Sequence, residues 1–112
     1  MFDGSGLSHS NAITTKQLMQ ILSGLKKESF FTNFYNSLPV AGESGAMKNM
    51  GDETAISGKL RAKSGHMDRI RSYAGFTSKS KKYAFAMIVN NYTCSPAEIK
   101  SRVEKVLVAM SF

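Results

Sequence analysis

The stretch that is most informative about the fold is Gly58-Lys59-Leu60-Arg61-Ala62-Lys63-Ser64-Gly65-His66-Met67. It is the first of three apolar or alternating stretches for which we expect strands: Lys59–Met67, Arg69–Thr77 and Tyr83–Tyr92. Polar turns separate them, at Met67-Asp68-Arg69 and at residues 78–82. The third strand is apolar on both faces, so we expect other layers of the structure to cover both. The second half of the chain therefore predicts a three-stranded antiparallel meander.

Two helices are expected before these strands. Thr14 and Gln17 have the spacing of a capping box, in which each residue's side chain bonds the other's backbone N–H. The apolar residues that follow have the spacing of one helical face: Leu18, Ile21, Leu22 and Leu25. A second, short helix is predicted over residues 28–36, and three of its aromatic residues are expected to face a core: Phe30, Phe31 and Phe34.

A terminal helix is predicted to start at Ser95-Pro96-Ala97-Glu98, which combines a capping serine, a proline in the first turn and a closing glutamate. Its expected buried face is Ile99, Val103, Val106, Leu107 and Met110. Residues 40–58 are rich in Gly, Ser and Asn, and we interpret them as a loop with one helical turn. The whole pattern predicts an α+β fold in which residues 1–112 form a single domain.

Composition narrows the classes of function. The net charge is +7, which favours an anionic partner such as a nucleic acid or a carboxylate-rich cell-wall polymer. No apolar run approaches the ~20 residues that a membrane-spanning helix needs, and no secretion signal is visible. Cys94 is the only cysteine, and the two histidines form no ligand pattern. We therefore expect no metal site and no cofactor.

Three segments carry the chemistry: Asp3-Gly4-Ser5-Gly6-Leu7-Ser8, Leu38-Pro39-Val40-Ala41-Gly42 and Lys63-Ser64-Gly65. Their order and spacing resemble the C-terminal part of the class C low-molecular-mass penicillin-binding proteins, the serine-type D-alanyl-D-alanine carboxypeptidases and endopeptidases. The strand sequence Tyr73-Ala74-Gly75-Phe76 is also similar to that family. The resemblance implies a portion of the penicillin-recognising serine hydrolase (β-lactamase-like) transpeptidase fold, in which a five-stranded antiparallel sheet is flanked by helices.

The resemblance also implies roles for the residues around the triplet. The Lys63 ammonium would stabilise anions in the cleft, and the Ser64 hydroxyl would hold the terminal carboxylate of a peptide. Because Gly65 has no side chain, a substrate could lie against the strand and pair with its backbone. His66 is expected to contact substrate, and the backbone N–H of Met67 is expected to form half of an oxyanion hole.

The nucleophile of such an enzyme lies in a Ser-x-x-Lys sequence at a helix start. That spacing occurs at Ser23-Gly24-Leu25-Lys26, at the end of a predicted helix, and at Ser78-Lys79-Ser80-Lys81, in a predicted turn. Neither position suits a nucleophile, and no Ser-x-Asn sequence follows. His9 stands where the family usually has a basic residue. We therefore expect no nucleophile in this chain.

The leading interpretation is the C-terminal portion of a periplasmic, penicillin-sensitive D-Ala-D-Ala carboxypeptidase, inactive alone, whose ligands are peptidoglycan stem peptides or β-lactams. We also expect self-association through an open sheet edge before Lys59. The alternative is a small basic module that binds nucleic acid or another polyanion through residues on adjacent strands: Lys59, Arg61, Lys63, Arg69 and Arg71. No nucleic-acid motif and no exposed aromatic platform supports that alternative, so we expect no nucleic-acid partner.

Overall fold

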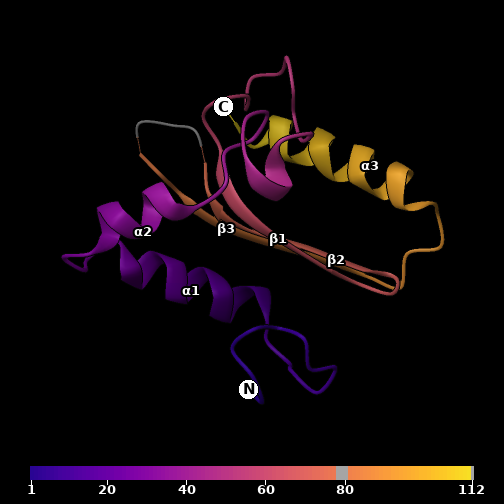
Figure 1. Cartoon of the computed structure of the whole chain (residues 1–112), viewed down its shortest axis with the longest axis horizontal. Coiled ribbons are helices and arrows are strands. Elements are labelled where there is room, and N and C mark those ends of the chain that lie inside the picture. Colours follow the sequence, from indigo (N-terminus) through magenta and orange to yellow (C-terminus); the bar gives the residue numbers. More distant parts are fainter. Residues whose placement is uncertain (78–80, 112) are drawn as a thin grey trace.

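A computed structural model, which describes residues 1–77 and 81–111, confirms the α+β class and the order of elements. A central antiparallel sheet lies between helices, with α1 on one side and α3 on the other (Figure 1). The elements in chain order are the helices α1 (Thr15–Leu25) and α2 (Phe31–Ser37), the 3₁₀ turn η1 (Gly45–Met47), the strands β1 (Arg61–Met67), β2 (Ile70–Phe76) and β3 (Ala84–Asn90), and the helix α3 (Pro96–Ala109).

The three strands form a meander in the order β1-β2-β3. Its register pairs Gly65 with Ser72 across β1 and β2, and Ser72 with Ile88 across β2 and β3. A two-residue turn at Asp68 and Arg69 joins β1 to β2. The predicted turn between the second and third strands includes residues 78–80, which lie outside the described residues.

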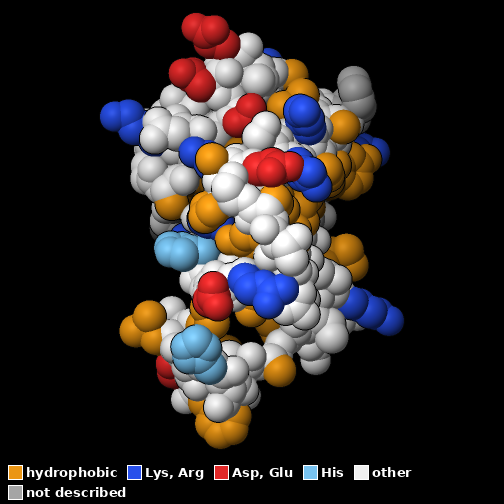
Figure 2. Space-filling view, turned by 90° about the vertical axis from the view of Figure 1, so that its right-hand side faces the viewer, with side chains coloured by type: hydrophobic (Ala, Val, Ile, Leu, Met, Phe, Trp, Pro, Cys, Tyr) orange, Lys and Arg blue, Asp and Glu red, His pale blue; other side chains and the backbone are white. Residues whose placement is uncertain are grey.

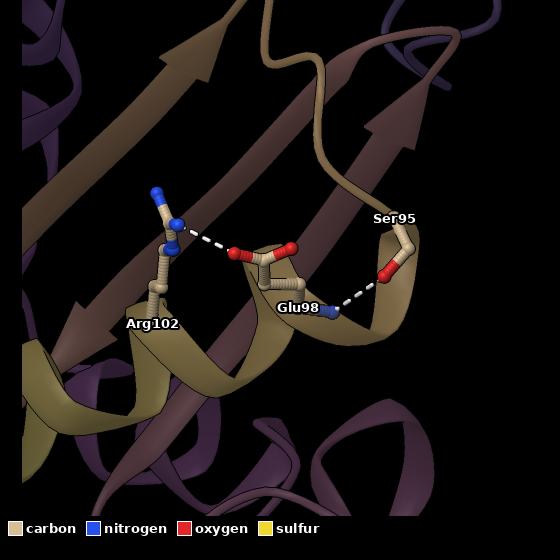
Figure 3. Close-up of polar contacts among 3 residues, drawn as sticks. All are labelled: Ser95, Glu98 and Arg102. Carbon is tan, nitrogen blue, oxygen red and sulfur yellow. Dashed lines mark hydrogen bonds and ion pairs between the residues drawn. The ribbon is translucent and has the colours of Figure 1, made fainter.

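The starts of α1 and α3 follow the sequence signals, except that the Glu98 side chain contacts Arg102 instead of closing the predicted box. Thr14 and Gln17 form the predicted capping box of α1, with Thr14 Oγ1 accepting from the Gln17 N–H at 3.1 Å. At the start of α3, Ser95 Oγ accepts from the N–H of Glu98 at 3.1 Å, and the Glu98 carboxylate contacts Arg102 one turn later (Figure 3). Side-chain acceptors at these two positions satisfy N–H groups that the first turn of a helix leaves unpaired.

The hydrophobic core lies between the sheet, α3 and the segment from residue 40 to residue 60. From α3 it takes Ile99, Val103 and Leu107. The segment contributes several of the most deeply buried side chains of the described chain: Ala41, Met47, Met50, Ile56 and Leu60. The sequence predicted one helical turn here, which η1 confirms, but not a share of the core.

Aromatic side chains of α2 pack on the other side of the sheet. Phe31 makes an edge-on contact with Phe76 of β2, with ring centroids 5.3 Å apart. The predictions that Phe30 and Val106 face the core are wrong, since they are 48% and 47% exposed. Phe30 precedes the first residue of α2, and Val106 lies to one side of the stripe that α3 buries.

Candidate functional site

The two faces of β1 carry different functional side chains. Ala62 belongs to the core on the α3 side, and the side chains of a strand alternate between its two faces. Ser64 and His66 therefore lie on the same face as Ala62. The side chains of Lys63 and Met67, and the position of Gly65, lie on the opposite face, towards α1. The predicted site residues are thus neighbours, divided between two faces of one strand.

The outer edge of β1 offers backbone groups to a ligand. At the start of the strand, Ala62 N–H donates outward to Pro39 O at 3.1 Å, beside a bridge between Val40 and Arg61. Because backbone groups alternate in direction along a strand, the N–H groups of Ser64 and His66 also point outward. By the same alternation, the N–H of Met67 points towards β2. This direction contradicts the prediction that Met67 supplies an oxyanion-hole donor, and it makes His66 the outward donor next to the triplet.

The Lys63 and Gly65 positions are fixed by close contacts. Lys63 Nζ donates to the carbonyl oxygen of Ser64 at 3.0 Å, so the ammonium lies at the outer edge of the strand. A Cβ atom at Gly65 would lie 2.7 Å from Ser72 Oγ, and that hydroxyl is 3.4 Å from Gly65 O. Ser72 therefore occupies the space beside Gly65, a role that the sequence did not reveal.

A hollow of about 1210 Å³ lies beside this half of β1. Residues 63–67 line one side, and the N-terminal loop with the first turns of α1 lines the other. Figure 2 shows a hollow between the lobe that holds the N-terminal loop, at the bottom, and the body of the molecule. The lining brings two of the three family-like segments together, Asp3–Ser8 and Lys63–Gly65, and it includes His9.

The loop Asp3–Ser8 is organised by one carboxylate. Asp3 accepts from the backbone N–H of Gly6 at 2.8 Å and of Ser8 at 2.9 Å. Asn11 Nδ2 also donates to Asp3 Oδ1 at 3.0 Å, while Asn11 Oδ1 accepts from the N–H of Phe2 at 2.7 Å. The side-chain bond from Asn11, followed by the backbone bonds, holds the pKa of Asp3 below its ordinary value. Asn11 was not among the predicted functional residues.

Of the two serines in Ser-x-x-Lys sequences, the structure describes Ser23, which lies where the sequence suggested. Ser23 lies in the last turn of α1, which ends at Leu25, and not at the start of a helix. The second Ser-x-x-Lys sequence begins at Ser78, outside the described residues. Within residues 1–77 and 81–111, no cluster of three or more His, Cys, Asp or Glu could hold a metal ion.

The basic residues of the alternative module do not share one surface. Arg61 donates to the carbonyl oxygens of Asn36 and Leu38 and lies over the Tyr35 ring, 5.0 Å from its centroid. Arg71 is opposite His66, on the α3 side of the sheet.

No described helix is long and apolar enough to cross a bilayer.

Three curated proteins are similar to this chain in sequence. A relative from Actinomadura sp. strain R39, a D-alanyl-D-alanine carboxypeptidase, is 32% identical over 102 residues, which cover 87% of this chain and 19% of the relative. The carboxypeptidase DacB of Haemophilus influenzae is 27% identical over 104 residues, covering 89% and 22%. Penicillin-sensitive carboxypeptidase A of Dictyostelium discoideum is 28% identical over 123 residues, covering 97% and 23%. The chain thus spans about a fifth of the length of these relatives.

Solved structures agree on the fold. Penicillin-binding protein 4 of Haemophilus influenzae superimposes with a TM-score of 0.78 at 26% identity, covering 96% of this chain and 25% of the other. A complex of that protein with a β-lactam gives a TM-score of 0.77 at 24% identity, covering 96% and 27%. The family model of the D-Ala-D-Ala carboxypeptidase 3 (S13) family matches residues 1–110. The chain belongs to the D-Ala-D-Ala carboxypeptidase 3 (S13) family.

Proposed function

We propose that this chain forms one wall of the substrate site of a serine-type D-Ala-D-Ala carboxypeptidase. The observation that carries the proposal is the outer edge of β1, where Lys63, Ser64 and Gly65 border the hollow that the N-terminal loop lines on its other side. An unpaired strand edge binds an extended peptide through its backbone groups, and its side chains select the peptide's ends. Membership of the family supports the same assignment.

The wall would act on the peptide as follows. The substrate lies along β1 with its terminal carboxylate at the Ser64 hydroxyl, and the Lys63 ammonium stabilises the negative charge nearby. The outward N–H of His66, in place of that of Met67, donates to the oxyanion that forms at the scissile carbonyl.

The chemistry is acyl transfer to a serine hydroxyl. The hydroxyl attacks the carbonyl of the last peptide bond, D-alanine leaves as a protonated amine, and water then hydrolyses the acyl-serine. We place that serine outside these 112 residues, because Ser23 lies at the wrong end of its helix.

β-Lactams are the second expected ligand class. The names of two relatives support this, because one is penicillin-sensitive and another was crystallised with a β-lactam. Peptidoglycan stem peptides as substrates imply action in the periplasm.

Intact-mass spectrometry after incubation with benzylpenicillin tests the proposal. We expect the 112-residue chain to keep its mass and the complete product of its gene to gain one penicilloyl group. An adduct on the 112-residue chain would place a nucleophile among its own serines and contradict the assignment. If neither protein gains mass, the proposed function is wrong.

A further inference from the structure

Positive charge gathers at the end of the molecule where α1 finishes and β3 begins (Figure 1). Lys26 Nζ donates to the carbonyl oxygen of Lys82 at 2.8 Å, so two segments that are far apart in the sequence lie side by side. Their lysines, three exposed and the last half-buried, form what we call the lysine patch: Lys26, Lys27, Lys81 and Lys82. Glu28 is the carboxylate nearest to them in sequence, and within residues 1–77 and 81–111 no ion pair involves a lysine of the patch.

The fold holds these charges together without neutralising them. Lys82 Nζ lies over the Tyr35 ring, 4.0 Å from its centroid, and the Arg61 guanidinium lies 5.0 Å from the same centroid. An aromatic ring attracts cations but carries no net charge, so the positive field of the patch remains. Neighbouring charges of one sign repel each other, and an anionic partner would relieve that repulsion.

Two exposed aromatic side chains border the lysine patch. Phe30, between the end of α1 and the start of α2, is 48% exposed, and Tyr83, next to Lys82, is 54% exposed. Large aromatic side chains beside lysines match the surface of a bilayer, where phosphate headgroups lie above an apolar layer. A nucleic-acid duplex offers the negative charge without that layer. The combination therefore favours a lipid surface over a polyanion.

We propose that the lysine patch, with Phe30 and Tyr83, docks this chain on a bilayer that contains anionic phospholipids. The ammonium groups bind lipid phosphates, and the two rings enter the headgroup region. The hollow beside β1 is lined by the first turns of α1, whereas the patch lies at the other end of that helix. With 11 residues, α1 is about 16 Å long, so docking leaves the hollow open. The inference goes beyond the proposed function and does not depend on it.

Vesicle binding by the 112-residue chain tests this surface. The vesicles contain phosphatidylcholine alone, or phosphatidylcholine with about 30% phosphatidylglycerol, which makes their surface negative. Flotation measures the bound fraction. We expect about a hundredfold tighter binding to the anionic vesicles, because three exposed lysines near such a surface contribute about fivefold each. The difference should shrink as salt is added.

Paired variants separate the lysine patch from the net charge of the chain. Lys27→Gln with Lys81→Gln should weaken binding to the anionic vesicles by about 25-fold. Lys48→Gln with Lys105→Gln removes the same charge at positions outside the patch, and should weaken binding by less than about threefold because salt screens distant charges. All four side chains are exposed, so both pairs of substitutions should leave the fold intact.

Phe30→Ser tests for the apolar layer. Serine is favoured at a helix N-cap, the position that Phe30 holds in α2, so the fold should tolerate this change. The variant should bind the anionic vesicles about fivefold more weakly, because less apolar surface enters the headgroup region. Its affinity for a DNA duplex should equal that of the unchanged chain.

Three results would overturn the inference. Equal binding to both kinds of vesicle, or binding to neither, would exclude an electrostatic bilayer site. Equal losses in the two lysine pairs would mean that net charge, and not the lysine patch, drives binding. A DNA duplex that binds as tightly as the anionic vesicles, with no effect of Phe30→Ser on either, would assign the patch to a polyanion. Acylation of the complete gene product by benzylpenicillin is a separate measurement, so none of these results would contradict the proposed function.

Discussion

Two glycines on neighbouring strands leave no room for a side chain, but different atoms fill the space beside them. A Cβ at Gly75 would lie 2.1 Å from Arg61 O and 2.6 Å from Ala62 Cα, both backbone atoms of β1. A Cβ at Gly65 would meet only the hydroxyl of Ser72, at 2.7 Å. A hydroxyl can rotate away, whereas a paired backbone cannot move without breaking the ladder.

Gly75→Ala is therefore expected to destabilise the chain by ~3 kcal/mol, through overpacking against backbone. Gly65→Ala should cost less than ~1.5 kcal/mol, and adding Ser72→Ala should recover part of that loss. Urea unfolding of the variants measures these differences. Equal losses in the free energy of unfolding for the two glycine variants would show that the β1–β2 pairing is looser than the Cβ distances at Gly75 imply.

The hydrogen bonds that hold the N-terminal loop should depend on pH, because the ionised carboxylate of Asp3 accepts them. Its pKa in the folded chain lies below the ordinary value of 3.8, because Asn11 and the N–H groups of the loop bond the ionised form. The loop's bonds are thus fully present above pH 3.8 and are lost as the pH falls through the folded pKa.

Amide signals of Gly6 and Ser8, followed by NMR from pH 6 downwards, should change together below pH 3.8. Asp3→Asn should remove this transition, whereas Asp68→Asn in the hairpin turn should leave it unchanged. Loop signals that titrate identically in Asp3→Asn would exclude Asp3 as the organising group.

At the scale of elements, the segment from residue 40 to residue 60 contributes more to stability than its composition suggests. Ile56 is fully buried within it, and Gly51 N–H donates to Glu104 Oε2 of α3 at 2.8 Å. Ile21, on α1, is 55% exposed. The two isoleucines therefore form a matched pair, one in an irregular segment and one in a regular helix.

Ile56→Ala should destabilise the chain by ~3 kcal/mol, the usual cost of a cavity at a fully buried isoleucine. Ile21→Ala should change the free energy of unfolding by less than ~0.5 kcal/mol, as exposed substitutions do. Chemical denaturation checks both values. A small effect at Ile56 would mean that the segment is not part of the cooperative core.

The elements that the sequence predicted best are those with local signals. The capping box at Thr14 and the Ser95-Pro96 start identify their helices because a few neighbouring residues satisfy the first N–H groups. The core contribution of Met47 and Ile56 could not be predicted, because no period of 2 or 3.6 links buried residues in an irregular segment. The prediction that Val106 is buried was wrong because the apolar face of α3 is one residue wider than the face that the sheet covers.

The candidate site shows a similar limit. The sequence located Lys63-Ser64-Gly65 on a strand, but the direction of each backbone group depends on which neighbour that strand pairs with. Pairing of Val40 with Arg61 sets this direction and turns the N–H of Met67 inward. The burial of Arg71 Nε without a hydrogen-bond partner among the described residues likewise depends on three-dimensional surroundings that spacing does not encode.

At the scale of the whole molecule, the sheet edges determine what the chain can bind. Pro39–Ala41 covers the first part of the β1 edge. In the described chain, the open sheet edge that we predicted is therefore limited to the second half of β1. In the described chain, β3 has a strand neighbour on one side only. Both edges could pair with a second chain.

Self-association through the β1 edge stays a prediction, which sedimentation equilibrium can test. His66→Pro removes one outward N–H and no ladder bond, so it should weaken dimerisation. Ala86→Pro removes an outward N–H at the outer edge of β3 instead, and it should leave association through the β1 edge unchanged. A wild-type chain that stays monomeric at millimolar concentration would contradict the prediction.

The most direct test of the peptide wall is the hydrogen-exchange rate of the β1 amides in the presence of saturating N-acetyl-D-alanyl-D-alanine. Ser64 and His66, whose N–H groups point outward, should exchange more slowly when the peptide is bound. The inward amides of Lys63, Gly65 and Met67 should be slow with or without it. Slowing at Met67 but not at His66, or no slowing anywhere along β1, would contradict the assignment of this edge as the substrate wall.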